Sequence, residues 1–220
     1  MGPTPAVTQA RTAIAVTEVA RAIHGGRVTL KTAAPSEARL GVSSRQRGTI
    51  IHAFLEQWDY RSNSDTAIES VLRGEALDDE DARVLRDDMT RIAGRLMACE
   101  LGVRIARSTD VRREVPFALR IDGILARGTM DLIVDGGIVV DYKTGAPSES
   151  ELAEYKTQLQ LYGAALRALA GVGSPEAYLV LLDVKTDFVR AVDCSIPATG
   201  LALERARDVL PGLAAPCAAG

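Results

Sequence analysis

Apolar residues recur at helical spacing through the first hundred residues of the chain. This spacing predicts helices at residues 8–24, 48–60 and 78–101. The pair Gly25-Gly26 ends the first helix, and acidic residues enrich the first turn of the third, where the helix dipole favours negative charge. The N-terminal half is therefore predicted to be helical.

Short alternating apolar runs then replace the helical period and predict strands at residues 114–121, 124–134 and 138–141. The turn Asp135-Gly136-Gly137 joins the last two, as in a tight antiparallel hairpin. Farther on, the pattern predicts a helix at 150–170, strands at 178–184 and 188–192, and a closing helix at 197–210. We therefore predict an α/β fold in which helices flank a mixed central sheet. Residues 1–210 would form a single domain, and the Ala/Pro/Gly-rich residues 211–220 a flexible tail.

Composition narrows the possible functions. The chain has 220 residues and a formal net charge of -3, which does not suggest a protein that coats nucleic acid through bulk charge, so any DNA contact must be local. Cys99, Cys194 and Cys217 lack any C-x-x-C spacing, which argues against a disulfide framework, a zinc knuckle or an iron-sulfur cluster. Without an apolar run of about 18 residues or a secretory leader, we expect a soluble, cytoplasmic protein.

Two acids and a lysine lie at the ends of the predicted hairpin strands. Asp141 and Lys143 leave the second strand on the same side, because strand residues two apart share a face. Closing the hairpin brings Asp131 close to Asp141. Two carboxylates, with the Tyr142 carbonyl as a third ligand, can then chelate a hard divalent cation that lowers the pKa of bound water. Lys143 would orient that water or stabilise the transition state.

A second D-x-K, formed by Asp183 and Lys185, follows another apolar run. A lone D-x-K is expected on the order of once or less by chance in a chain of this length. This copy lacks an acid about ten residues upstream across a tight glycine turn. We interpret it as the end of a later strand.

Four sequence blocks follow one another in the middle of the chain: Arg47-Gly-Thr-Ile-Ile-His52-Ala-Phe-Leu-Glu, then Glu114-Val-Pro-Phe117, then Gly128 through Lys143, and then the Q-x-x-x-Y pair Gln158 and Tyr162. Each block is short, but the ordered set resembles the RecB-type branch of the PD-(D/E)xK nuclease superfamily. This branch comprises nuclease domains of bacterial recombination helicase-nucleases and related exonucleases. The resemblance implies one RecB-type nuclease domain with a restriction-endonuclease-like core.

The resemblance also implies roles for individual residues. His52 would bind metal through a neutral imidazole, beside Asp131 and Asp141, with Lys143 as the catalytic lysine. By itself, a histidine beside an apolar stripe is more often a core residue with satisfied hydrogen bonds. The ordered motif favours the metal ligand.

Other candidates have two interpretations each. Gln158 and Tyr162 share a helical face and would position the DNA backbone or the active-site lysine, unless Tyr162 simply belongs to the apolar stripe. Glu114 is either a site residue or a solvated acid at the start of a strand. Arg45 and Arg47 either contact DNA phosphates or are solvated.

The sequence predicts a metal-dependent DNA nuclease that hydrolyses phosphodiesters on single strands or ends, in DNA repair or recombination end processing. It would use Mg²⁺ or Mn²⁺ and no iron-sulfur cluster, and the resemblance implies products with 5′ phosphates. No phosphate-binding loop G-x-x-x-x-G-K-[ST] is present, so the chain would act alone or with a helicase. One alternative is a catalytically silent DNA-binding or scaffolding domain of a helicase-nuclease complex. The other is a carboxylate-metal hydrolase of small phosphorylated substrates.

Overall fold

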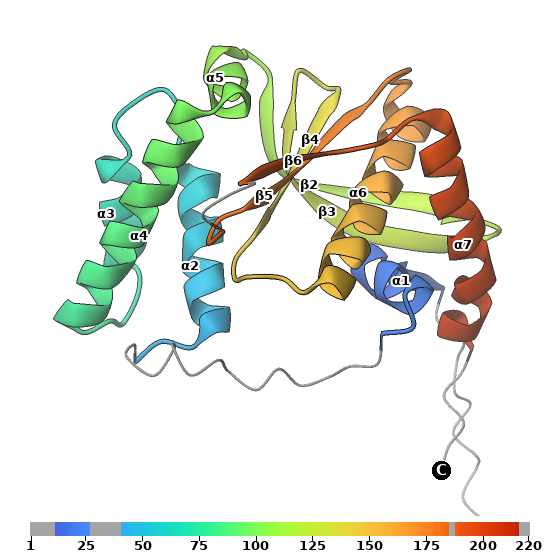
Figure 1. The fold of residues 1–220 in the computed structure, drawn as a ribbon, viewed down its shortest axis with the longest axis horizontal. Coiled ribbons are helices and arrows are strands. Elements are labelled where there is room, and N and C mark those ends of the chain that lie inside the picture. Colours follow the sequence, from blue (N-terminus) through green and yellow to red (C-terminus); the bar gives the residue numbers. More distant parts are fainter. Residues whose placement is uncertain (1–11, 27–40, 185–187, 216–220) are drawn as a thin grey trace, which may run out of the picture.

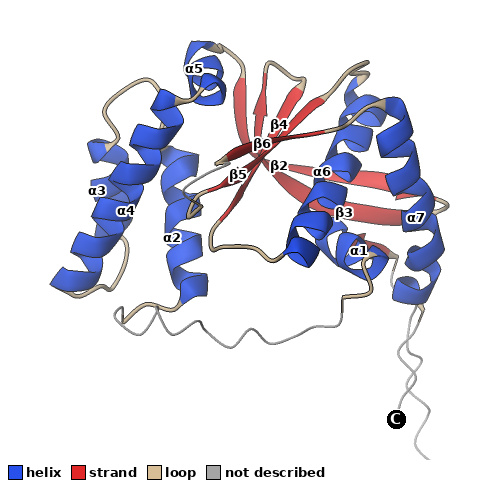
Figure 2. Cartoon of the chain, in the orientation of Figure 1, coloured by secondary structure: helices blue, strands red, loops and turns tan. Residues whose placement is uncertain are grey.

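A computed structural model describes residues 12–26, 41–184 and 188–215, which form a six-stranded mixed sheet between two groups of helices (Figures 1 and 2). The sheet order is β1 (Ala13–Ala15), β3 (Ile124–Val134), β4 (Ile138–Lys143), β5 (Glu176–Leu181) and β6 (Val189–Val192), with β2 (Val111–Ile121) also paired to β3. Strand β1 is parallel to β3 and β4 is parallel to β5, whereas the other pairs are antiparallel. The predicted α/β fold with a flanked mixed sheet is confirmed.

Four helices cover one face of the sheet, on the left of Figure 1: α2 (Ser44–Gln57), α3 (Asp65–Arg73), α4 (Asp79–Ala98) and α5 (Glu100–Arg107). Side-chain caps begin three of them, because Ser43 accepts from the backbone of Gln46, Asp78 from that of Asp81 and Cys99 from that of Gly102. Their apolar faces and one face of the sheet form the first core, which contains Phe54 and Leu132. This layer carries His52.

Three helices cover the opposite face: α1 (Val16–Ile23), α6 (Glu149–Ala170) and α7 (Ile196–Ala214). Helix α6 connects the parallel strands β4 and β5. It begins with a capping box between Ser148 and Glu151 and ends at Gly171 in the left-handed conformation. These helices and the sheet form the second core, which contains Leu159, Tyr162 and Met130.

Several predicted boundaries were wrong. Within the predicted helix 8–24, residues 13–15 form β1, because pairing with β3 places buried Ile14 in the second core; residues 8–11 lie outside the described part. Helix α2 begins four residues early, at the Ser43 cap, so Arg45 and Arg47 lie in its first turns. The predicted helix 78–101 ends at Ala98, and α3 was not predicted.

The chain's last described helix also differs from expectation. Helix α7 continues to Ala214 rather than ending at Leu210, and buried Ala214 packs in the second core. The predicted flexible tail therefore loses its first four residues to the helix, and residues 216–220 lie outside the described part. None of the described helices is both long and apolar enough to cross a membrane.

The ladder between β2 and β3 contains a change of face. On β3, Leu132 packs in the first core, but Met130, two residues earlier, packs in the second. A regular strand keeps such residues on one face. The change occurs at Asp131 and at Glu114, which lies between the paired positions opposite Leu132 and Met130 and has a φ of +47°. The two acids therefore lie where β2 and β3 exchange the face that packs on the first core for the face that packs on the second.

Candidate active site

The β3–β4 hairpin brings Asp131 and Asp141 to the same level of the sheet. Asp135 and Gly136 adopt φ values of +50° and +67°, as a tight hairpin turn with two left-handed residues requires. Leu132 then pairs with Val140, which leaves Asp131 and Asp141 one step farther along. The Tyr142 backbone N–H donates to Asp131 Oδ2 at 2.8 Å. This bond holds the Asp131 carboxylate against β4.

Asp141 is almost completely buried, with 1% of its surface exposed. Its Oδ2 lies 2.5 Å from Lys143 Nζ, and its Oδ1 accepts from Gln158 Nε2 at 3.1 Å. Burial alone would lower the pKa of Lys143, but Asp141 and Asp131 raise it above its ordinary value. The lysine therefore keeps its positive charge at neutral pH.

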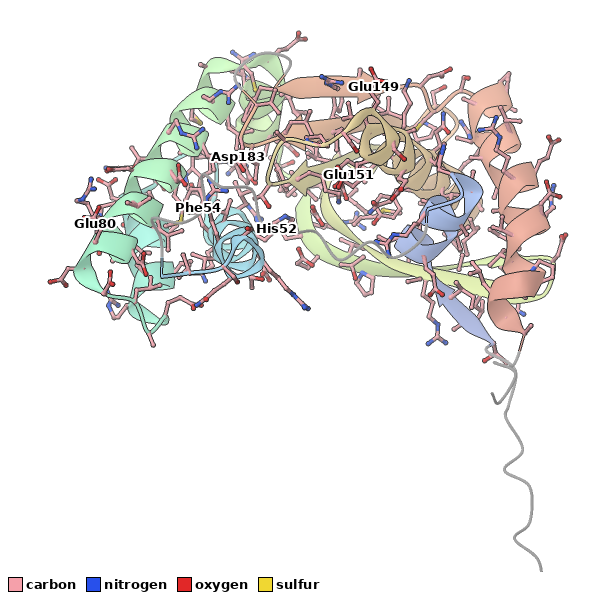
Figure 3. All side chains as sticks on the ribbon, turned by 60° about the horizontal axis from the view of Figure 1, so that its bottom comes forward. His52, Phe54, Glu80, Glu149, Glu151 and Asp183 are labelled. Atoms are coloured by element: carbon pink, nitrogen blue, oxygen red, sulfur yellow. The ribbon has the colours of Figure 1, made fainter. Side chains whose placement is uncertain are left out.

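His52, Glu114 and Asp131 form a possible metal-binding group, in which one ligand atom from each lies within 4.8 Å of the others. His52 projects from α2 toward the sheet (Figure 3), and its Nδ1 lies 3.8 Å from Asp131 Oδ2. Burial and the charge of Lys143 lower the pKa of His52, so the imidazole is neutral at pH 7 and has a lone pair for a cation. Carboxylate and imidazole ligands of this kind suit Mn²⁺, and the carboxylates suit Mg²⁺.

The acids hold their protons unusually tightly. Burial, followed by the nearby charge of Asp141, raises the pKa of Asp131 to about 7. Burial and the charges of Glu56 and Asp141 raise the pKa of Glu114. Burial is the largest cause in both acids, and the negative charge of neighbouring carboxylates adds to it. A bound divalent ion would oppose both effects.

Gln158 and Tyr162 lie behind Asp141, on the buried face of α6. Gln158 Nε2 also donates to Tyr162 Oη at 2.5 Å, and Tyr162 Oη donates to the Thr129 carbonyl at 2.9 Å. Both side chains are buried, with 4% and 2% exposed. Gln158 therefore links Asp141 to Tyr162, and Tyr162 links Gln158 to the Thr129 carbonyl.

The absence of a side chain at Gly128 leaves room for the Tyr162 ring. A Cβ added at Gly128 would come within 2.8 Å of the Phe117 ring and 3.5 Å of the Tyr162 ring. The two rings pack edge to face, with centroids 5.3 Å apart. A side chain at position 128 would push this pair out of place.

We call Glu114, Asp131 and Asp141 the acidic cluster. Arg47 does not join it, because two other carboxylates bind its guanidinium. Nη1 and Nη2 donate to Asp183 at 2.8 and 2.7 Å, and Nε and Nη2 donate to Asp88 at 2.9 and 2.6 Å. Asp183 also accepts from the Gly145 backbone N–H at 2.6 Å. Arg45 is exposed at the start of α2. Of the two arginines, only Arg45 remains available to a phosphate.

Asp183 therefore has a structural role that the sequence did not indicate. It connects α2, which carries His52, to the loop that begins after Lys143 (Figure 3). We call the group of Arg47, Asp88, Asp183 and Gly145 the Asp183 clamp. Arg47 and Asp183 are 136 positions apart, so no local pattern reveals their contact.

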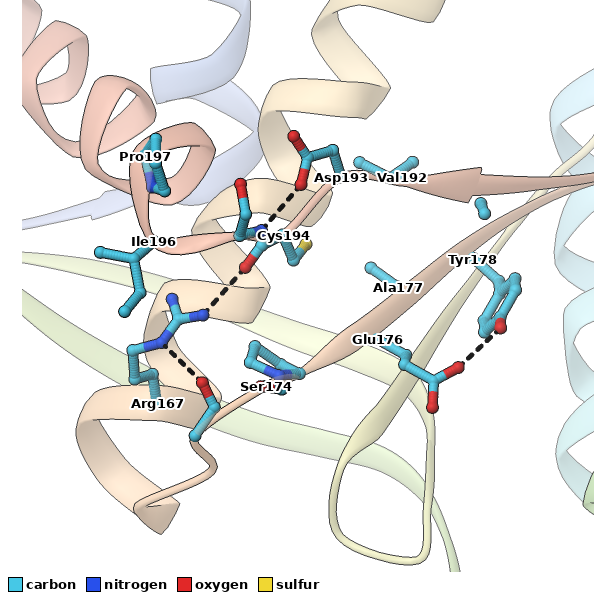
Figure 4. A pocket seen from close by; sticks show the side chains of 14 residues that line it. Arg167, Ser174, Glu176, Ala177, Tyr178, Val192, Asp193, Cys194, Ile196 and Pro197 are labelled. Carbon is cyan, nitrogen blue, oxygen red and sulfur yellow. Dashed lines mark hydrogen bonds between the residues drawn. The ribbon is translucent and has the colours of Figure 1, made fainter.

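A pocket of about 630 Å³ lies elsewhere, between β5, β6 and the start of α7 (Figure 4). None of the candidate site residues lines it. Arg167 in its wall donates to the Cys194 carbonyl at 2.9 Å and to Thr199 Oγ1 at 2.8 Å. Its guanidinium is therefore already bound by other groups of the protein.

Comparison with known proteins agrees with the geometry of the acidic cluster. The PD-(D/E)XK nuclease superfamily matches residues 24–217. The chain belongs to this superfamily. The ATP-dependent helicase/nuclease subunits A of Acetivibrio thermocellus and Carboxydothermus hydrogenoformans are each 30% identical to it, over 66% and 64% of this chain. The matches cover only 13% and 14% of those longer proteins. The predicted RecB-type relationship is confirmed.

A solved structure supports the PD-(D/E)XK fold. The putative exonuclease from Eubacterium rectale aligns with 97% of this chain and 85% of its own, at a TM-score of 0.55 and 12% sequence identity. At that identity the likeness concerns the fold alone.

Proposed function

We propose that the chain is a metal-dependent deoxyribonuclease that hydrolyses phosphodiester bonds in DNA repair or recombination end processing. The observation that carries this proposal is the group of His52, Glu114 and Asp131, whose ligand atoms lie within 4.8 Å of one another. Asp141 and Lys143 lie directly beside it, 2.5 Å apart. Membership of a nuclease superfamily supports the same chemistry.

Mg²⁺ or Mn²⁺ would be held by His52 and Asp131, with Glu114, Asp141 and the Tyr142 carbonyl as further oxygen ligands. The raised pKa values of Asp131 and Glu114 support this assignment, because burial and neighbouring carboxylates disfavour their charged forms and a bound cation would favour them. Bound there, the ion would lower the pKa of a coordinated water and neutralise charge on the phosphate.

The surrounding residues would then complete the site. Lys143 would direct its ammonium toward the attacking water or the developing negative charge of the phosphate. Gln158 would hold Asp141 through one oxygen while the other faces Lys143, and Tyr162 would fix Gln158. Arg45 would contact a phosphate near the start of α2. Some residues would thus touch the water or the metal, and others would orient those residues.

The test incubates end-labelled single- and double-stranded DNA with the protein and Mg²⁺, Mn²⁺ or EDTA. We expect cleavage by the unchanged protein with metal and none with EDTA, and a loss of at least about 100-fold in the variants Asp141→Ala and Lys143→Ala. Glu69→Gln is the matched control, because it removes an exposed acid that pairs with Arg86 away from the site. Its cleavage rate should not change.

Two results would contradict the proposal. DNA binding without cleavage under every metal condition would favour a silent DNA-binding or scaffolding domain. Cleavage of small phosphate esters but not of DNA would favour a small-substrate hydrolase. Comparing both substrates in one experiment separates these outcomes.

A further inference from the structure

Beyond the acidic cluster, one face of the β2–β3 ribbon carries exposed side chains and is not covered by any helix among the described residues. We call it the open ribbon face; its exposed members are Ala15, Pro116, Ala118, Arg120, Arg127 and Thr129. The register pairs Pro116 with Thr129, Ala118 with Arg127 and Ala15 with Arg127, so these side chains are neighbours. The opposite face of the same ribbon packs in the second core through Leu119, Ala126 and Met130.

The open ribbon face is continuous with the acidic cluster. The two faces of the β2–β3 ribbon exchange at Glu114 and Asp131. Toward the tip of the ribbon, the side chains on the same face as these acids are therefore exposed. Arg127 lies four residues from Asp131 along β3, about 13 Å at the usual strand rise. Arg120 lies six residues from Glu114 along β2, about 20 Å away. The surface therefore leads outward from the metal-binding group.

The charge of this face matches that of a phosphate backbone. Arg127 makes no hydrogen bond or ion pair with any other described residue, and it is exposed. Arg120 uses only Nη1 within the described part of the chain, for the Gly123 carbonyl at 3.2 Å. The remaining members are small and uncharged, so nothing on the face repels a phosphate. No aromatic ring is present among them for base stacking, which leaves the backbone as the part to be recognised.

We propose that the open ribbon face guides a single DNA strand to the metal-binding group, with Arg127 and Arg120 contacting its phosphates. This inference rests on the proposed nuclease function and adds the route of the substrate. The three strands β1, β3 and β2 give a width of roughly 10 Å, which accommodates one phosphate backbone. Binding through phosphates alone makes the strand's base sequence unimportant.

The first experiment measures binding without cleavage. Fluorescence anisotropy of a labelled single-stranded oligonucleotide in EDTA, over a series of salt concentrations, gives the dissociation constant and its salt dependence. The double variant R120E/R127E should bind at least about tenfold more weakly at low salt, and Arg127→Gln should reduce the slope of log K against log salt by about 0.7. Arg127→Lys should restore most of the affinity, because it keeps the charge.

Arg205→Gln is the matched control for Arg127→Gln. Arg205 is exposed on α7, which covers the other face of the sheet, and both substitutions remove one positive charge. Its affinity and its salt dependence should equal those of the unchanged protein. If R120E/R127E also binds like the unchanged protein, or if the unchanged protein binds no oligonucleotide, the inference is overturned.

The second experiment separates this inference from the nuclease proposal. The rate for the oligonucleotide is compared with that for bis(p-nitrophenyl) phosphate, a diester too small to reach Arg120 from the metal-binding group. The rate for the oligonucleotide, divided by the rate for the small diester, should fall about tenfold in R120E/R127E, mainly because the KM for the oligonucleotide rises. Arginine-dependent binding with no hydrolysis of either compound would uphold the strand path and reject the nuclease. Hydrolysis of both compounds with an unchanged ratio would do the opposite.

Discussion

Asp131 carries its negative charge where burial and a second carboxylate oppose it. Its pKa is raised to about 7, against an ordinary value of 3.8. The folded state therefore holds this proton more tightly than the unfolded chain does. Its contribution to stability is greatest below pH 4 and is lost as the pH rises through 7. In the metal-free protein, ionised Asp131 destabilises the fold.

Asp131→Asn should therefore stabilise the metal-free protein at pH 8. Asparagine keeps an oxygen for the Tyr142 N–H but removes the charge. We expect a gain of about 1 kcal/mol, or a rise in Tm of about 2–4 °C. Thermal unfolding in EDTA at pH 4 and pH 8 measures it, and the gain should nearly vanish at pH 4, where the carboxyl group is largely protonated in both the folded and the unfolded chain. An equal gain at both pH values would contradict this account of Asp131.

The affinity for a metal ion should rise with pH, whereas the stability contributed by Asp131 falls. Below pH 7 a proton occupies Asp131 and competes with the cation, whereas above pH 7 the carboxylate is free. Mn²⁺ affinity should fall by up to about tenfold per pH unit below 7. Calorimetric titration at pH 6, 7 and 8 measures the affinity. A constant affinity over this range would show that Asp131 is not a ligand.

Gln158 offers a test of the residues behind the ligands. Gln158→Ala frees one oxygen of Asp141 and removes the partner of Tyr162. The loss of such an orienting partner should lower metal affinity or activity by about 10- to 100-fold. Gln160→Ala, on the same helix but bonded to the Asp193 carbonyl, is the control. Equal activity of the two variants would leave Gln158 with a packing role only.

At the scale of the elements, the Asp183 clamp joins α2 to the loops that follow β4 and β5. Asp183→Asn removes the charge that binds Arg47 but leaves an acceptor for the Gly145 N–H. We expect a loss of about 1–3 kcal/mol in the free energy of unfolding and a higher Mg²⁺ concentration for half-maximal activity, because α2 carries His52. Urea unfolding and a Mg²⁺ titration measure the two effects. Loss of stability with unchanged Mg²⁺ dependence would limit the clamp to a structural role.

The elements also show what the sequence could predict. The β3–β4 hairpin follows from local chemistry, since Gly136 adopts the positive φ of the turn and the apolar runs fix the register that brings Asp131 to Asp141. Strand β1 does not, because three residues beside a helical pattern become a strand only when β3 pairs with them. Glu114 had two weak signals, its place in the second of the four sequence blocks and its position at the start of a predicted strand. Its left-handed backbone is visible only in the fold.

At the scale of the whole molecule, the site draws on both cores. His52 comes from the layer that packs in the first core, and Gln158 from the layer that packs in the second. A cation that binds only the assembled site should stabilise the entire domain. At 100 times the dissociation constant, Mn²⁺ should add about 2.7 kcal/mol, or about 5–10 °C in Tm. Asp131→Asn should lose most of this shift in a thermal unfolding experiment, and an equal shift in that variant would contradict it.

The exchange of faces at Glu114 and Asp131 limits the insertions that the β2–β3 ribbon can accept. The register of β2 and β3 is continuous through this point, so the chain reverses its inward and outward sides without adding a residue. One residue inserted on either strand beyond it would exchange the arginines of the open face with the apolar side chains of the second core. We therefore expect β2 and β3 to accept insertions of two residues but not of one, whereas the turn at Asp122 and Gly123 should accept either.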